Sequence, residues 1–143
     1  MIWFSSDHHF GHANIIKYAS RPFDSVEAMD TELIRRWNEV VGERDTVYYL
    51  GDFTMGDRAS RYFRCLRGKV YVLACDWHHD KRWIKSDNVL WTNVKGFDYR
   101  NPPDGFFEVT MLPPLYVLTS DSDEHPPISL CHYQKSVHRG AVA

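Results

Sequence analysis

The chain has 143 residues, of which 43% are hydrophobic and 15% aromatic, enough for one compact domain with a hydrophobic core. Its 17 basic and 19 acidic side chains give a formal net charge of -2, which excludes coating of a polyanion by bulk charge alone. No apolar stretch approaches the roughly 20 residues of a membrane span, and the three cysteines contain no CxxC pair. We therefore expect a single cytoplasmic domain over residues 1–143 that neither spans a membrane nor coats nucleic acid.

The first half of the chain alternates between predicted strands and helices. The expected elements are strands at 1–6, 46–50 and 69–74 and helices at 13–19, 24–41 and 58–66. Arg21-Pro22-Phe23 ends the first helix, and Asp24 or Ser25 is placed to cap the second, whose apolar residues recur at helical spacing. We expect the first strand to be buried. The order βαβαβ indicates helices packed on a largely parallel sheet.

The second half is rich in short β-type runs. From residue 88 onward VLWTNV, FFEVTML, LYVLTS and ISLCHY are separated by the pairs Pro102-Pro103, Pro113-Pro114 and Pro126-Pro127. We interpret these runs as antiparallel strands of a second sheet. The expected fold is therefore α/β, with two sheets and flanking helices.

Polar side chains of the metal-ligand type follow the predicted strands. These residues are Asp7 and His9 after the first strand, Asp52 after the second, Asp76, His78, His79 and Asp80 after the third, and His132 after the run ISLC. In an open α/β sheet, ligands bind at the carboxyl ends of the strands. The four groups are therefore expected to converge on one edge of the sheet.

Imidazole and carboxylate groups together suit manganese, iron, zinc or nickel better than magnesium or calcium, which favour all-oxygen ligand sets. Two such ions about 3.5 to 4 Å apart share a carboxylate and clamp a phosphoryl group. Asp52 is the simplest shared ligand, because it lies alone at the end of a central strand. The spacing thus predicts a divalent metal centre that activates water.

Four segments resemble the calcineurin-like metallophosphoesterases, in particular the small bacterial and phage members. They are SDHHFGH at 6–12, GDF at 51–53, CDWHHD at 75–80 and LCHY at 130–133. The superfamily has DxH, GDxx, GNH(D/E), a lone His and GHxH in this order. The resemblance extends over residues 1 to about 139 and implies a metallophosphoesterase-type β-sandwich flanked by helices.

The resemblance also implies roles for individual residues. Asp7 and His9 match DxH and are expected to bind the first metal, and Asp52 is expected to bridge both. His132 matches the lone histidine of the second metal. The implied cofactors are two divalent ions per chain if the site is intact, Mn²⁺ before Ni²⁺, Zn²⁺ or Fe²⁺.

The third motif departs from the family pattern, since CDWHHD stands where the family has GNHD. If Asp80 matches the last residue of the motif, His78 is the ligand and His79 assists the leaving group. If the motif is counted from the end of the strand, Asp76 is the ligand and Trp77 occupies the catalytic position. We prefer Asp76 or His78 as the ligand and His79 as the acid.

The closing GHxH has no match, and the chain ends at VHRGAVA, so we expect a domain truncated at the C-terminus relative to the family and weaker metal binding. Asp7, His9 and Asp52 remain for one metal. Asp52, Asp76 or His78, and His132 remain for the other. Three ligands can still hold a catalytic ion with open positions.

Other residues have two interpretations each. We expect His8 to be structural, because it points away from its neighbours Asp7 and His9. His12 either caps the helix that follows it or contacts a substrate phosphate, and Asn14 is a helix cap or a substrate contact. The residues that line the substrate mouth or serve an ordinary surface role are Trp83, Trp91, His138 and Arg139.

The leading hypothesis is a metal-dependent phosphoesterase (hydrolase) that cleaves phosphomonoesters or phosphodiesters of small substrates with a metal-bridging hydroxide and His79 as acid. One alternative is a non-catalytic or mononuclear metal-binding module of the same fold. Another is a different hydrolytic or redox activity at a mononuclear His/Asp site. A homo-oligomer that completes each site with a neighbour's His138 stays open.

Overall fold

The structure is a computed structural model, which describes residues 1–56, 58–73, 80, 82–83, 89–91, 107–112, 115–119 and 126–131. Within these ranges no helix has the length and apolar character needed to cross a membrane.

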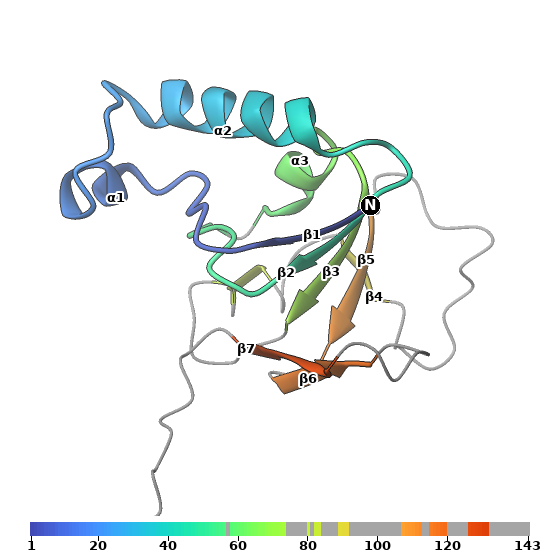
Figure 1. The fold of residues 1–143 in the computed structure, drawn as a ribbon. Coiled ribbons are helices and arrows are strands. Elements are labelled where there is room, and N and C mark those ends of the chain that lie inside the picture. Colours follow the sequence, from blue (N-terminus) through green and yellow to red (C-terminus); the bar gives the residue numbers. More distant parts are fainter. Residues whose placement is uncertain are drawn as a thin grey trace, which may run out of the picture.

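Helices and strands alternate in the first half of the described chain (Figure 1). The helices are α1 (Ala13–Tyr18), α2 (Val26–Val40) and α3 (Ser60–Phe63), and the strands are β1 (Ile2–Ser5), β2 (Thr46–Tyr49), β3 (Lys69–Leu73), β4 (Val89–Trp91), β5 (Phe107–Leu112), β6 (Leu115–Leu118) and β7 (Ile128–Cys131). The predicted order of the first six elements is confirmed. Ser25 is the N-cap of α2, where its hydroxyl accepts a hydrogen bond from the backbone N–H of Ala28 at 3.1 Å. The helix expected over 58–66 is shorter and is confined to α3.

The strands of the described chain form a parallel sheet in the order β1-β2-β3-β5-β4 and a two-stranded antiparallel sheet of β6 and β7. The expectation that all four late runs form a second antiparallel sheet is therefore wrong for two of them. β5 pairs in parallel with β3, where Val72 lies opposite Met111, and β4 pairs in parallel with β5. The sequence between β4 and β5, residues 92–106, is long enough for the crossover that a parallel neighbour requires. In the sequence, Pro113-Pro114 stands between β5 of the parallel sheet and β6 of the antiparallel sheet, whereas the other two proline pairs each stand between strands of one sheet.

The two faces of the parallel sheet are covered differently. Figure 1 shows α2 and α3 on one side of the sheet and β6 with β7 on the other. The helical side holds the larger core, in which Trp37 of α2, Phe63 of α3 and Val47 of β2 belong to one buried cluster. On the opposite side, Leu73 and Leu112 at the ends of β3 and β5 cluster with Leu130 of β7. The architecture is thus mixed α/β, with the carboxyl ends of the central strands close to the antiparallel pair.

The expectation that the first strand is buried is wrong. β1 forms an edge of the described sheet and pairs only with β2 there. Its side chains alternate, so that Trp3 packs against the helical core whereas Ile2 and Phe4 remain 57% and 47% exposed. The apolar run at the start of the chain is therefore an edge strand with only one face covered.

His8 belongs to the packed interior. Its ring stacks on Phe10, with 5.3 Å between ring centroids, and its backbone N–H donates to the hydroxyl of Tyr49 at 2.9 Å. The Tyr49 hydroxyl in turn lies 2.9 Å from Nδ1 of His8, which accepts the hydroxyl proton when the ring is neutral. Burial, followed by the positive charge of Arg21, lowers the pKa of His8 from 6.5 to about 4. The ring is therefore uncharged at neutral pH.

This pKa shift predicts a loss of stability in mild acid. As pH falls below about 6.5 the unfolded chain binds a proton at His8 before the folded chain does, so the free energy of unfolding decreases until the pH reaches about 4. The decrease due to His8 is about 3 kcal/mol at most. Urea unfolding between pH 4 and 7.5 should give a shallower pH dependence for His8→Asn, whose side-chain oxygen still accepts from Tyr49. Parallel curves for the two proteins would contradict the prediction.

Candidate metal centre

The segments that follow β1 and β2 run side by side beyond the ends of the strands. Backbone N–H groups of Asp7, His9 and Phe10 donate to the carbonyls of residues 51, 52 and 53, at 3.0, 3.1 and 2.8 Å. Thr54 extends this pairing, because its hydroxyl donates to the carbonyl of Phe10 at 2.8 Å. We call residues 7–10 and 51–54 the paired loops. They bring two polar segments, more than 40 positions apart in the sequence, to one edge of the sheet.

Three residues of the paired loops have strained backbones. Asp7, His9 and Asp52 have φ values of 59°, 54° and 56°, in the left-handed region that residues with a Cβ rarely occupy. Each such residue costs on the order of 1 kcal/mol or more and persists only when the surrounding structure holds it in place. Within the paired loops these are the residues that the sequence identifies as ligands of the first metal, whereas Ser20, with a φ of 49°, lies outside the loops. Such a coincidence is typical of a functional site.

The side chains of the same three residues converge. One potential ligand atom from each of Asp7, His9 and Asp52 lies within 4.8 Å of the other two. Nε2 of His9 is 3.9 Å from a carboxylate oxygen of Asp7 and 3.7 Å from one of Asp52. Two ligand atoms that each bind an ion at about 2.1 Å lie no more than about 4.2 Å apart. The two measured separations therefore fit one divalent ion between these groups.

The three side chains of the cluster differ in their exposure to solvent. The side chains of His9 and Asp52 are 10% and 15% exposed, whereas that of Asp7 is 54% exposed. The cluster is therefore anchored in the protein on one side and open to solvent on the side of Asp7. His9, Asp52 and Asp7 would hold an ion here, and the exposure of Asp7 would leave access for a further ligand from solvent.

His12 lies behind His9. Its Nδ1 is 3.4 Å from Nδ1 of His9, and both rings are nearly buried. A metal-binding histidine usually has a partner on its second ring nitrogen, which fixes the ring orientation. His12 is the N-cap residue of α1 by position, but its side chain makes no capping hydrogen bond. Of its two expected roles, the structure thus shows the capping position without a capping bond, and contact with a substrate phosphate stays a prediction.

Sequence reasoning did not find the role of Arg21. Its guanidinium donates to the backbone carbonyls of Asp7 and His8, at 2.7 and 2.6 Å. These carbonyls belong to the strained turn that carries the metal-type side chains. The only sequence signal was an arginine next to a helix-breaking proline, which does not show that its side chain folds back on a loop 13 residues earlier.

Asp80 is hydrogen-bonded to the backbone of the second of the paired loops, residues 51–54. It is 1% exposed, and its Oδ1 accepts hydrogen bonds from the backbone N–H groups of Phe53 and Thr54, at 2.8 and 3.3 Å, and from Nε1 of Trp83 at 2.6 Å. Burial raises the pKa of this carboxyl, as does the nearby charge of Asp52. Trp83 is fully buried in the core, so neither of its expected roles, at the substrate mouth or on the surface, is correct.

The other expected site residues are distributed as follows. Asn14 lies in the first turn of α1 and is exposed to solvent. His8 points away from the cluster toward Tyr49, as expected for a structural residue. The expected residues that lie outside the described ranges are Asp76, Trp77, His78, His79, His132, His138 and Arg139. Their roles, and the choice between the two alignments of CDWHHD, stay predictions.

Comparison with known proteins places the chain among relatives whose names state no activity. No protein-family model matches the sequence. The chain is 37% identical over 109 residues to the uncharacterized protein MJ1445 of Methanocaldococcus jannaschii, an alignment that covers 73% of this chain and 61% of the relative. It is 43% identical over 79 residues to the gene 66 protein of Mycobacterium phage L5, covering 55% of this chain and 33% of that protein. The chain thus spans less than two thirds of each of these relatives.

A solved structure shares the fold. The crystal structure of AQ665, a protein of unknown function from Aquifex aeolicus, superposes with a TM-score of 0.61 at 23% identity. The match covers 93% of this chain and 60% of the Aquifex protein. At this identity the likeness establishes the architecture, and function has to be inferred from the site.

We predict that Arg21 sets the affinity of the cluster for metal. Lysine cannot donate to two carbonyls in the fixed geometry of a guanidinium, so Arg21→Lys should weaken Mn²⁺ binding by about tenfold, the usual effect of losing a residue that orients a ligand. Isothermal titration measures the affinity. Arg36→Lys, on the exposed face of α2, is the matched control. Equal affinities in the wild type and Arg21→Lys would contradict the positioning role.

We also predict that Mn²⁺ stabilises the folded chain through Asp52. At a free concentration 100 times the dissociation constant, binding adds about 2.7 kcal/mol, or a rise in Tm of about 5–10 °C. Asp52→Asn should abolish this rise, because asparagine tolerates the left-handed backbone but brings no charge. Metal analysis after desalting should give one Mn²⁺ per chain if only the described cluster binds, and two if the candidate ligands outside the described ranges complete a second site. An undiminished thermal shift in Asp52→Asn would exclude the cluster as the site.

Proposed function

We propose that the protein is a metal-dependent phosphoesterase that hydrolyses a small phosphomonoester or phosphodiester at the cluster of Asp7, His9 and Asp52. The observation that carries the proposal is the convergence of these three side chains from two strand ends, each on a strained backbone. The order of the motifs in the sequence supports the same class, because DxH and GDF supply these residues. The metallophosphoesterase-type sandwich is the finer form of the fold that we propose for the whole domain.

A divalent ion held by Asp7, His9 and Asp52 would act as a Lewis acid toward a phosphoryl oxygen and would lower the pKa of water toward neutrality. The carboxylates of Asp7 and Asp52 provide negative charge to hold the ion. His9 directs Nε2 toward both carboxylates, while its Nδ1 faces His12. His79 is proposed, on the resemblance, to protonate the leaving oxygen.

The described cluster suits a phosphate ester as substrate only together with a bound cation. Two carboxylates alone would repel a phosphate, so the site requires a cation before it accepts one. The exposure of Asp7 leaves one side open for a substrate, and the inner side is closed by His9 and Asp52. A bound ion would thus have the phosphate on its solvent side and the fold on the other.

A second candidate function is a mononuclear metal-binding module without turnover. It is favoured by the number of ligand side chains, since the cluster in the described residues has three, enough for one ion. In that case the same residues hold the ion, and the protein serves as a binding or scaffold module.

The phosphoesterase proposal predicts hydrolysis that depends on Asp52. With Mn²⁺, the wild type should release p-nitrophenolate from p-nitrophenyl phosphate or bis(p-nitrophenyl) phosphate, and Asp52→Asn should lose at least about 100-fold in kcat/KM, or about 2.7 kcal/mol. Absorbance at a series of substrate concentrations gives both constants.

The matched control is Asp24→Asn, an exposed aspartate that precedes α2 and lies outside the cluster. It should keep the wild-type rate. Full activity in Asp52→Asn would remove the cluster from the reaction. One bound Mn²⁺ with no hydrolysis of either ester would favour the binding module.

A further inference from the structure

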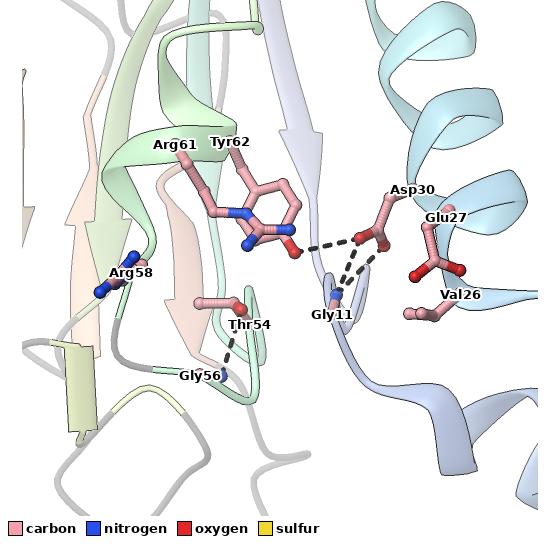
Figure 2. A pocket seen from close by; sticks show the side chains of 9 residues that line it. All are labelled: Gly11, Val26, Glu27, Asp30, Thr54, Gly56, Arg58, Arg61 and Tyr62. Carbon is pink, nitrogen blue, oxygen red and sulfur yellow. Dashed lines mark hydrogen bonds between the residues drawn. The ribbon is translucent and has the colours of Figure 1, made fainter.

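A cavity of about 230 Å³ is lined by residues of the loop after β1, of α2, and of α3 with the segment before it (Figure 2). Two of its lining residues, Gly11 and Thr54, lie two positions after His9 and Asp52 in the same two segments. Consecutive Cα atoms are 3.8 Å apart, so the Cα atom of each lining residue is at most about 7.6 Å from that of the corresponding ligand. The cavity and the cluster are therefore immediate neighbours.

The floor of the cavity is rigid and its polar groups are paired. The carboxylate of Asp30 accepts hydrogen bonds from the backbone N–H of Gly11, at 3.1 and 3.2 Å, and from the hydroxyl of Tyr62 at 3.0 Å. Figure 2 shows these bonds joining α2, the loop after β1, and α3. Gly11 has a φ of +69°, and a Cβ there would lie 2.8 Å from the Tyr62 hydroxyl. Two donors, the Gly11 N–H and the Tyr62 hydroxyl, thus bind the carboxylate of Asp30 in the floor, while burial still raises its pKa.

The wall formed by α3 and the residues before it is cationic. Arg58 and Arg61 line the cavity, and Arg61 is held in place over the ring of Tyr62, with its Cζ 4.7 Å from the ring centroid. Among the described residues, neither guanidinium forms an ion pair, whereas Arg35 and Arg36 of α2 are paired with Glu32. The opposite wall carries Glu27, whose side chain is exposed and therefore screened by solvent. The planar set of donors of an arginine matches the oxygens of a phosphate.

The size of the cavity limits the ligand. Pockets that enclose a drug-sized molecule hold about 300–1,000 Å³, so a cavity of about 230 Å³ fits one small group better than a nucleoside. We propose that it is a subsite for a second phosphate group of the substrate, bound by Arg58 and Arg61 while the phosphoryl group to be cleaved lies at Asp7, His9 and Asp52. This inference rests on the proposed function, and it identifies the substrate class as phosphoesters that carry a further phosphate.

The test uses two substrates that differ in one phosphate. Thymidine 5′-(p-nitrophenyl phosphate) and its 3′-phosphorylated form release the same p-nitrophenolate from the same phosphodiester. The 3′-phosphate should lower KM by about tenfold and leave kcat within about twofold, because the extra contact is equal in the ground state and the transition state. Arg58→Met/Arg61→Met should remove this advantage, so that the two substrates have equal KM values within the variant.

Two control variants accompany this comparison. Methionine keeps an unbranched side chain over Tyr62, and the single variants serve if the double variant does not fold. Arg64→Met, at the C-cap of α3 and outside the cavity, should behave as the wild type. Equal KM values for the two substrates in the wild type would overturn the subsite while leaving the phosphoesterase proposal intact.

A binding measurement separates the two proposals if hydrolysis is absent. Thymidine 5′-monophosphate and unphosphorylated thymidine are titrated into the full chain in EDTA, where only the arginine subsite accepts a phosphate, with the backbone amide signals of Gly11 and Gly56 followed by NMR. Tighter binding of the monophosphate than of thymidine, lost in Arg58→Met/Arg61→Met, supports the subsite even without turnover. Unshifted Gly11 and Gly56 signals, or affinities that do not depend on the two arginines, would overturn it.

Discussion

The pairing of two loops by backbone hydrogen bonds is the constraint on which the site depends. β1 and β2 are parallel neighbours, so the segments that follow them leave the sheet at the same edge and in the same direction. The N–H groups of residues 7, 9 and 10 find acceptors in residues 51–53, and this pairing continues the contact of the strands into the loops. Buried backbone groups require partners. Here those partners also determine where the side chains of Asp7, His9 and Asp52 point.

The strain in these loops is balanced by contacts from elsewhere in the fold. Left-handed backbone at three non-glycine residues raises the free energy of the folded chain by a few kcal/mol in total. Arg21 holds the first loop by two carbonyls, and Asp80 holds the second by two backbone N–H groups. Neither residue belongs to the cluster of potential ligands. The loops are thus organised in advance for a cation, which reduces the cost of ordering them when one binds.

The segments that follow β1 and β2 contribute residues both to the candidate metal-binding cluster and to the cavity, which differ in charge. The cluster of Asp7, His9 and Asp52 is acidic, and the adjoining cavity has arginines on one wall. Asp30 stabilises the boundary, because it joins α2 to Gly11 and Tyr62 while being almost fully buried. A cation on one side and a phosphate on the other would complement these charges. This arrangement is the physical basis of both proposals, and the names of the relatives add nothing to it.

The sequence by itself determined the order of the first six elements, limited the cap of α2 to Asp24 or Ser25, and identified the three converging residues of the cluster. The elements follow from local propensity and helical periodicity, and the convergence follows from the general rule that parallel strands end at one edge of a sheet. Only the tertiary structure decided that β4 and β5 join the parallel sheet, that β1 is an exposed edge, and that Trp83 is buried against Asp80. Strand order depends on contacts between segments that are distant in the sequence, as do the contacts of Arg21, Asp30 and Asp80. The sequence around each of these residues contains no pattern that identifies its partner. The left-handed backbone at Asp7, His9 and Asp52 was also decided only by the tertiary structure. Hydrogen bonds between the paired loops impose this conformation against the intrinsic backbone preference of the residues.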